Sequence, residues 1–307
     1  MINNRLKIAF IYILLCIIWG STWIVIRTGL TSLPPIISVG YRFSLASLFV
    51  FSLMKYNNFK LQTDKTSVIL YVLMAFFSYI FPFSLVYWAE SPQAGVPSGL
   101  SAVLFGVYPF FIALFSYFFI DSEIINASKI AGMIFGFLGI VIIFSDSFRG
   151  NISAFFLGMA AIVLSAAVQA AILIVIKKFG HHLNPLSMNF IPMILAGIIL
   201  LFSGYYLEDS SQLKFNSAAV LSVIYLAFFG STVTFTSYYW LLKRVNVVVL
   251  SMIAFITPIV ALLLGWIFYD EQLSFNHFWG TIFVLSGLLI ANLGNLRKFN
   301  NLGFKKS

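Results

Sequence analysis

Charge is what this sequence has least of. Only 9% of its 307 residues are charged, with 18 lysines and arginines against 9 acids. A soluble domain carries about 25% charged residues, whereas hydrophobic residues make up 61% of this chain. That balance excludes an ordinary water-soluble enzyme and predicts an all-α protein that crosses a membrane several times.

Cysteine is nearly absent as well, since Cys16 is the single one and lies in an apolar run. No intramolecular disulfide and no Cys-x-x-Cys pair is therefore possible. His181 and His182 are neighbours in a predicted loop and His277 is isolated, which supplies no tetrahedral ligand set. We predict no metal and no cofactor.

Nucleotide and catalytic motifs are missing too. No P-loop, Gly-x-Ser-x-Gly, His-Glu-x-x-His or dinucleotide fingerprint stands in a suitable context, so ATP-driven transport is not expected from this chain. A membrane-embedded transferase needs clustered acids or an Asp/His pair. The acids here are scattered among predicted turns, and we predict that the protein is not an enzyme.

Long apolar stretches are abundant. A bilayer-spanning helix takes about 20 apolar residues, and strand-like alternation is absent. Ten runs are expected to be transmembrane helices, with ends uncertain by about two to four residues. They are 8–28, 34–54, 67–88, 97–119, 128–145, 153–176, 185–206, 217–240, 247–268 and 276–294.

The formal charge of +9 would favour nucleic acid in a soluble protein, but here the basic residues fall in short loops. With the N-terminus inside, only Arg27, Arg149 and Lys214 lie in outer loops, and Arg42 lies within the second run. The other lysines and arginines are then cytoplasmic, as the positive-inside rule demands. We predict an uncleaved first helix, both termini in the cytoplasm of a bacterial inner (plasma) membrane, and no nucleic-acid partner.

The sequence repeats itself with an offset near 150 residues. Each half therefore holds five helices, and the odd number turns the second half upside down in the membrane. Two inverted units of this kind build a cavity at their shared midplane. The predicted units are 8–146 and 153–295, and the matching positions include Pro35 and Pro185, Tyr87-Trp88 and Tyr239-Trp240, Pro109 and Pro258, Glu123 and Glu271, and Gly139 and Gly287.

Two of the repeated positions are prolines inside apolar runs, Pro109 in Leu100–Phe119 and Pro258 in Val247–Phe268. An internal proline removes a backbone hydrogen bond and costs about 3 kcal/mol in a helix interior, which a membrane bundle tolerates where neighbours satisfy the freed carbonyl. Matching interrupted segments in the two halves indicate a transporter binding site. We expect Pro109 and Pro258 to be hinges.

These residues resemble the EamA family of the drug/metabolite transporter superfamily over nearly the whole chain, as two tandem units. The resemblance is carried by WGSTW (Trp19–Trp23), the segment Tyr41-Arg42-Phe43, the stretch Tyr87–Pro109, GFLGIVII (Gly136–Ile143) and ITPIVALLLGWIFYDEQL (Ile256–Leu273). The second unit is more degraded at its start. The resemblance implies secondary active transport of small metabolites, often export of amino acids or related compounds. It also implies a cavity lined by the first, third, fourth, sixth, eighth and ninth helices.

Two charged residues near apolar runs are candidate anchors. Arg42 in the second run costs about 2.5–3.5 kcal/mol to place at the bilayer centre, so it binds the carboxylate of a substrate, ties helix-end carbonyls together, or snorkels to the outer face. Glu90 ends the third run. It is either a proton-coupling or ammonium-binding carboxylate or an exposed loop charge before Ser91 and Pro92.

Polar and aromatic side chains within the runs are candidate cavity residues. Tryptophans four residues apart share a helix face, and hydroxyls at helical spacing form a stripe in the eighth run. The alternatives are plain packing and hydroxyls that satisfy their own backbone. The candidates are Trp19, Ser21, Trp23, Tyr87, Tyr108, Gln169, Ser231, Thr234 and Tyr238. Gly132 and Gly136 predict close helix packing within the chain.

The function predicted from these features is secondary active transport of a small metabolite, an amino acid or a related compound, exported by alternating access across the lipid bilayer. Coupling by proton or substrate antiport belongs to this hypothesis. The alternative is a flippase-like carrier of a lipid-linked or amphipathic substrate, which an aromatic-rich cavity open sideways to lipid would favour.

Overall fold

The computed structural model describes residues 2–119, 127–145, 153–242 and 253–301, and the regular secondary structure within these ranges is all helical, with turns between the helices. Pro109 and Pro258 lie inside the described ranges, whereas the predicted acidic partner Glu123 and the loop residue Arg149 lie outside them. The helices are α1 (Ile2–Gly29), α2 (Pro35–Tyr56), α3 (Lys65–Met74), η1 (Ala75–Ile80), α4 (Phe81–Glu90), α5 (Ser98–Phe105), α6 (Tyr108–Phe119), α7 (Ala127–Ser145), α8 (Ala154–Phe179), α9 (Pro185–Leu207), η3 (Ser210–Gln212), α10 (Ser217–Ala227), η4 (Phe228–Val233), α11 (Thr234–Leu242), α13 (Ile253–Tyr269) and α14 (Phe275–Asn301).

Consecutive elements join into long apolar rods. Within the described residues, eight rods are long and apolar enough to cross a membrane, among them Lys65–Glu90, Ser98–Phe119 and Ser217–Tyr238, each built from more than one helical element. Two shorter apolar helices, Ile256–Tyr269 and Phe275–Ala291, accompany them. Such a set of helices defines an integral membrane protein. The number of ten spans and the inverted repeat stay predictions.

Local sequence sets where the helices begin. Pro35 and Pro185 occupy the first positions of α2 and α9, where a missing N–H costs nothing because that donor has no partner within the helix. The side chains of Asp64, Asn184 and Ser153 accept backbone N–H bonds at the starts of α3, α9 and α8. These caps pair donors that would otherwise be left without partners.

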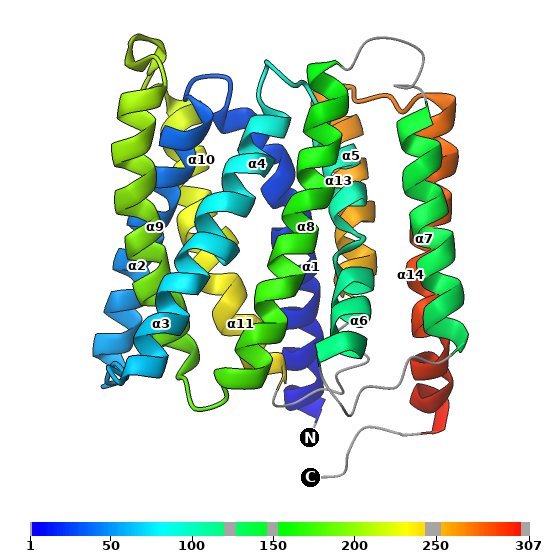
Figure 1. The fold of residues 1–307 in the computed structure, drawn as a ribbon, viewed down its shortest axis with the longest axis horizontal. Helices are drawn as coiled ribbons and strands as arrows, with labels where there is room; N and C mark the ends of the chain where they lie inside the picture. The colour runs from blue at the N-terminus through cyan, green and yellow to red at the C-terminus, as the bar shows by residue number, and fades with distance from the viewer. Residues whose placement is uncertain (1, 120–126, 146–152, 243–252, 302–307) are drawn as a thin grey trace.

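Glycine brings two pairs of helices into backbone contact at opposite flanks of the bundle, α2 with α9 and α7 with α14 (Figure 1). A Cβ atom at Gly132 would lie 2.5 Å from the carbonyl oxygen of Gly287, and one at Gly287 would lie 2.6 Å from the nitrogen of Gly136. A Cβ atom at Gly197 would lie 2.7 Å from the nitrogen of Ser44. The prediction that Gly132 and Gly136 serve packing within the chain is confirmed.

The rod Ser98–Phe119 is broken, which the sequence analysis did not predict. α5 ends at Phe105 and α6 begins at Tyr108, so Pro109 lies in the first turn of a new helix. There its lack of an N–H costs little. Pro258 differs, because it lies inside α13, which continues past it to Tyr269. The two repeated prolines therefore have different local structures.

Two π-helical segments stand at matching places in the chain. η1 interrupts the rod of α3 and α4, and η4 interrupts the rod of α10 and α11. Each spans six residues and contains a Phe-Phe pair. In a π-helix each backbone hydrogen bond joins residues five apart instead of the four of an α-helix. Such segments occur frequently at functional sites. One buried apolar cluster packs around both π-helical segments. It consists of residues of α1, α2, α4, α9 and α10 together with Tyr79 of η1.

Candidate functional site

Arg42 lies buried where α2 meets the rods of α4 and η4. Its Nη1 donates to the hydroxyl oxygen of Tyr87 at 3.3 Å and its Nε donates to Ser231 Oγ at 3.3 Å. Its Nη2 donates to the carbonyl of Gly230 at 3.4 Å. The guanidinium also lies 4.9 Å from the centre of the Phe83 ring, a cation–π distance. Three predicted candidates, Arg42, Tyr87 and Ser231, thus come together from three separate rods.

The π-helical turn explains why a carbonyl is available to Arg42. Ser231 and Thr232 of η4 direct their hydroxyls to the carbonyls of Leu226 and Ala227, five residues earlier. The irregular ladder leaves the carbonyl of Gly230 to accept from the arginine. A Cβ atom at Gly230 would lie 3.5 Å from Arg42 Nη2, in ordinary contact. One of the alternatives for Arg42, a bond to a helix carbonyl, is present in the structure. Snorkelling of Arg42 to the surface is wrong, because only 4% of the residue is exposed.

Arg42 is a buried cation without a described counter-charge. Its contacts are two hydroxyls, one carbonyl and aromatic rings, and no carboxylate of the described residues pairs with it. These contacts are long for N–H···O bonds, and the guanidinium has more N–H groups than they use. A buried charge without a partner is costly. The arrangement can therefore accept an anionic group, for which a guanidinium offers paired donors.

A second charged cluster closes one end of the bundle, and we call it the clasp: Arg27, Ser98, Gly99 and Glu271. Glu271 follows α13 and accepts from the backbone N–H of Ser98 and Gly99, both at 2.9 Å, and from Ser98 Oγ at 2.8 Å. Its other partner is the guanidinium of Arg27 at the end of α1. The carboxylate thus caps the N-terminus of α5, where negative charge is favoured, and joins α1, α5 and α13.

Glycine makes room for the clasp. A Cβ atom at Gly265 would lie 2.4 Å from Glu271 Oε2, and one at Gly20 would lie 2.5 Å from the Cβ of Val260. The missing side chain at Gly265 leaves space for the Glu271 carboxylate, and the missing side chain at Gly20 lets α1 approach α13 closely. The ring of Tyr269 lies 5.1 Å from the guanidinium carbon of Arg27, and its hydroxyl donates to Thr28 at 3.0 Å. Contacts of Arg27 and Thr28 therefore hold this end of α1 against the end of α13.

Glu90 lies close to the clasp and is 3% exposed. The interpretation of Glu90 as an exposed loop charge is therefore wrong, because α4 carries it into the bundle before the chain turns at Ser91. The polar group that faces its two oxygens is the buried hydroxyl of Ser101, and no backbone N–H or basic side chain of the described residues donates to them. Arg27 and Glu271 are the charged groups of the described residues that act on it.

The predicted aromatic candidates form two contacts between rods. Trp19 of α1 lies 5.5 Å from Tyr238 of α11, centre to centre. One turn further, Trp23 lies 5.5 Å from Phe105, and Phe105 stacks on Tyr108 at 5.6 Å. Both tryptophans are partly buried. One face of α1 therefore contacts α11 through Trp19 and, one turn further along, the break before Pro109 through Trp23.

The remaining candidates are bonded to their own surroundings. Ser21 donates to the carbonyl of Ile18 and lies 2.7 Å from the Tyr225 hydroxyl, while Thr234 donates to the carbonyl of Ser231. Gln169 donates to Ser165 of its own helix at 3.3 Å. Hydroxyls that satisfy nearby backbone carbonyls are the alternative that the sequence analysis left open. Only Ser231 among these hydroxyls also receives a bond from Arg42.

Sequence reasoning missed the clasp. Glu271 reads as one more acid in a turn, and Arg27 reads as a loop charge, 244 residues away along the chain. The available signal was the acidic turn that follows each proline-containing run. That signal does not identify the partner of Glu271. The partner is the N-terminus of α5, and the sequence alone did not show that a helix begins at Ser98.

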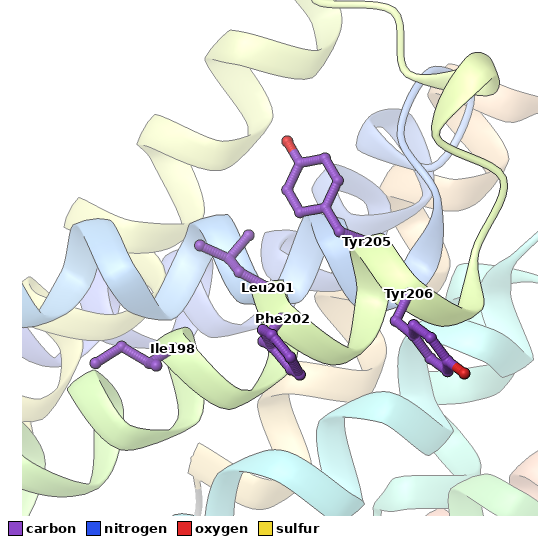
Figure 2. A pocket seen from close by; sticks show the side chains of 5 residues that line it. All are labelled: Ile198, Leu201, Phe202, Tyr205 and Tyr206. Atoms are coloured by element: carbon purple, nitrogen blue, oxygen red, sulfur yellow. The ribbon is translucent and has the colours of Figure 1, made fainter.

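Two grooves lie on the outside of the bundle and are apolar. One, of about 520 Å³, is lined by five side chains of α9; Figure 2 shows Leu201 and Tyr205 rising to one side while Phe202 and Tyr206 point to the other. Tyr205 meets Tyr41 of α2 through their hydroxyls at 2.5 Å. The second, of about 450 Å³, lies among α6, α7 and α8 and includes Phe111 and Phe144. Surfaces of this composition suit contact with lipid chains.

The comparisons with known proteins agree with this architecture. The model of the EamA-like transporter family matches residues 6–145 and 156–293. An uncharacterized transporter of Buchnera aphidicola is 26% identical over 97% of this chain and 98% of its own length. The uncharacterized inner membrane transporter YedA of Escherichia coli K12 is 29% identical over 91% of this chain and 89% of its own length. A solved structure, described only as a crystal structure of a protein, has the same fold with a TM-score of 0.67 at 16% identity and covers 94% of this chain and 98% of its own.

The fold and the matched ranges define a polytopic α-helical membrane protein of the transporter class. The chain belongs to the EamA-like transporter family within the drug/metabolite transporter superfamily. Its members are transporters of small molecules, and no finding points to a catalytic activity.

Proposed function

We propose that this protein is a secondary active transporter that exports a small carboxylate-bearing metabolite, an amino acid or a related compound, by alternating access. The substrate binds between two inverted five-helix units, and Arg42 holds its carboxylate. Both termini face the cytoplasm of a bacterial inner membrane, and antiport of a proton or a second substrate drives export. A relative named as an inner membrane transporter supports the location.

The observation that carries the proposal is the unpaired charge of Arg42. It reaches from α2 to Tyr87 on the third predicted span and to Ser231 on the eighth. Those spans belong to different predicted units and are two of the expected cavity helices. A cation buried at that junction, with no carboxylate among the described residues, is stabilised when a substrate supplies one. The Tyr87 hydroxyl accepts from Arg42, so its own proton can be donated to the same carboxylate.

The direct test compares acids with their amides. Purified protein is heated in the presence of each amino acid and of the matching amino-acid amide, which lacks the carboxylate. Bound ligand raises the melting temperature by mass action, so the acid should raise it and the amide should not. In Arg42→Gln we expect this difference to disappear. Equal shifts from acid and amide in the parent protein, or an unchanged difference in Arg42→Gln, would contradict the proposal.

A pair of tyrosine variants provides the matched control. Tyr87→Phe removes a hydroxyl that bonds Arg42. Tyr79→Phe, in the π-helical segment η1, removes a comparably buried hydroxyl that bonds Asn189 at 2.7 Å. Each loses one buried hydrogen bond, worth about 0.5–1.5 kcal/mol. We expect only Tyr87→Phe to weaken the response to acids. If both variants weaken it equally, the tyrosine acts through packing alone.

A flippase-like carrier of an amphipathic substrate is the second candidate, and the apolar groove among α6, α7 and α8 favours it. An acyl chain would lie along Phe111 and Phe144 while the headgroup entered the bundle. Leu164→Trp fills this groove and should abolish the transfer of a short-chain fluorescent phospholipid between leaflets of proteoliposomes. Absence of any such transfer by the parent protein would exclude this candidate.

A further inference from the structure

The N-terminal part of α5 contacts two carboxylates, Glu271 and Glu90, which differ in how many donors they have. Glu271 receives its backbone N–H groups, the Ser98 hydroxyl and the guanidinium of Arg27. Glu90 faces the hydroxyl of Ser101, three residues further along the same helix, and no backbone N–H or basic side chain of the described residues donates to its oxygens. Arg27 therefore pairs with Glu271 and not with Glu90, although its charge also acts on Glu90.

Burial makes this difference chemically important. An ionised carboxylate without donors, taken out of water, costs several kcal/mol, whereas a neutral carboxylic acid costs much less. The charged groups facing Glu90 are Arg27 from α1 and Glu271 after α13, and Tyr87 lies one turn back on its own helix. Arg27 is already paired with Glu271, whose negative charge opposes a second one nearby. Glu90 is thus set up to hold a proton while the clasp is closed.

We propose that Glu90 is the proton-binding site of this transporter and that the clasp controls it. With the clasp closed, Arg27 pairs with Glu271, Glu90 is a neutral acid, and the Ser101 hydroxyl is its neighbour. When the clasp opens, Arg27 leaves Glu271 and faces Glu90, whose O–H bond breaks and releases one proton to water, leaving a carboxylate beside the arginine. Closure reverses the step. This inference rests on the proposed transport function for its purpose, but the proton itself can be observed without a substrate.

Infrared spectroscopy of the purified full-length protein in detergent provides the test, since a protonated carboxylic acid has a carbonyl stretch separate from that of carboxylates. At neutral pH we expect one such band, absent from Glu90→Gln. Glu271→Gln frees Arg27, and we expect the band to be lost there too although Glu90 is intact. Ser101→Ala, which removes only the facing hydroxyl, should keep the band and shift its frequency.

Glu208→Gln is the matched control. Glu208 is half-buried but accepts from the backbone N–H of Ile36 at 2.8 Å and of Ile37 at 2.9 Å, so its replacement should leave the band unchanged. A spectrum without the band at neutral pH, or a band that survives Glu90→Gln, would overturn the assignment of the proton. A band that Glu271→Gln leaves untouched would overturn control by the clasp. A protein with the band but without transport would instead refute the proposed function.

Discussion

Three charged side chains of the described residues are buried at the candidate site, and each is surrounded by a different set of contacts. Arg42 contacts hydroxyls, a backbone carbonyl and aromatic rings. Glu271 contacts an arginine and a helix N-terminus, and Glu90 faces the hydroxyl of Ser101. The sequence singled out Arg42 and Glu90 because charges in apolar runs are rare and costly. It could not identify their partners, since Arg42 meets residues 45 and 189 positions away.

The exposed acid Asp64 allows a test of how its charge stabilises the start of α3. Asp64 precedes α3 and accepts from Ser67 N at 3.1 Å and from Ser67 Oγ at 2.5 Å. These hydrogen bonds hold the pKa of Asp64 below its ordinary value of 3.8. A pKa lowered by folding gives stability that is complete above the ordinary value and is lost as the pH falls through the folded value.

Asp64→Asn should therefore melt at a lower temperature than the parent at neutral pH, because the charge–dipole attraction at the start of α3 is removed. The difference should shrink as the pH is lowered below about 4 and the parent's carboxylate is protonated. Thermal melts of both proteins across this range make the comparison. A difference that is constant at every pH would show that shape, not charge, is responsible.

At the scale of helices, irregularities decide how the bundle is built. The sequence indicated irregular helices through Pro109 and Pro258 but misplaced the first break, which falls at Gly106 and Val107. At the second proline the described helix α13 runs unbroken from Ile253 to Tyr269. The π-helical segments η1 and η4 had no signal beyond a run of hydroxyls and repeated Phe-Phe pairs. Their formation depends on contacts from other helices, such as Arg42 with Gly230, and these contacts exist only in the folded bundle.

The break before Pro109 makes a testable element. Pro109 fixes the first turn of α6, and replacing it allows α5 and α6 to join into one straighter helix. Pro109→Ala should keep or raise the melting temperature, because alanine is the better helix former, while it slows transport several-fold. Transport is measured in proteoliposomes with whichever amino acid stabilises the protein most. Pro192→Ala, at the proline inside α9, is the control that should leave the transport rate near that of the parent. Equal rates for Pro109→Ala and the parent would refute the hinge.

At the scale of the whole molecule, two glycine-packed pairs of helices stand at the flanks (Figure 1). Arg42 lies on α2 of one pair and points to helices that stand between the pairs. The helical class, the membrane setting and the family followed from composition and motifs, because these depend on the chain alone. The clasp did not follow, because an ion pair between α1 and the end of α13 depends on how helices meet. The start of α1 and the end of α14 lie at the same end of the bundle, opposite the clasp (Figure 1).

Alternating access through this clasp is the central claim, and a reversible cross-link tests it most directly. In a Cys16→Ala background, Gly99→Cys with Leu262→Cys joins α5 to α13, since a Cβ atom at Gly99 would lie 3.0 Å from the Cα of Leu262. Ser145→Cys with Asn276→Cys joins α7 to α14, where the Asn276 amide donates to the Ser145 hydroxyl at 3.1 Å. The account predicts that oxidation of the first pair stops amino-acid exchange in proteoliposomes and that reduction restores it, while oxidation of the second pair changes little. Undiminished exchange with the first pair fully cross-linked would contradict it.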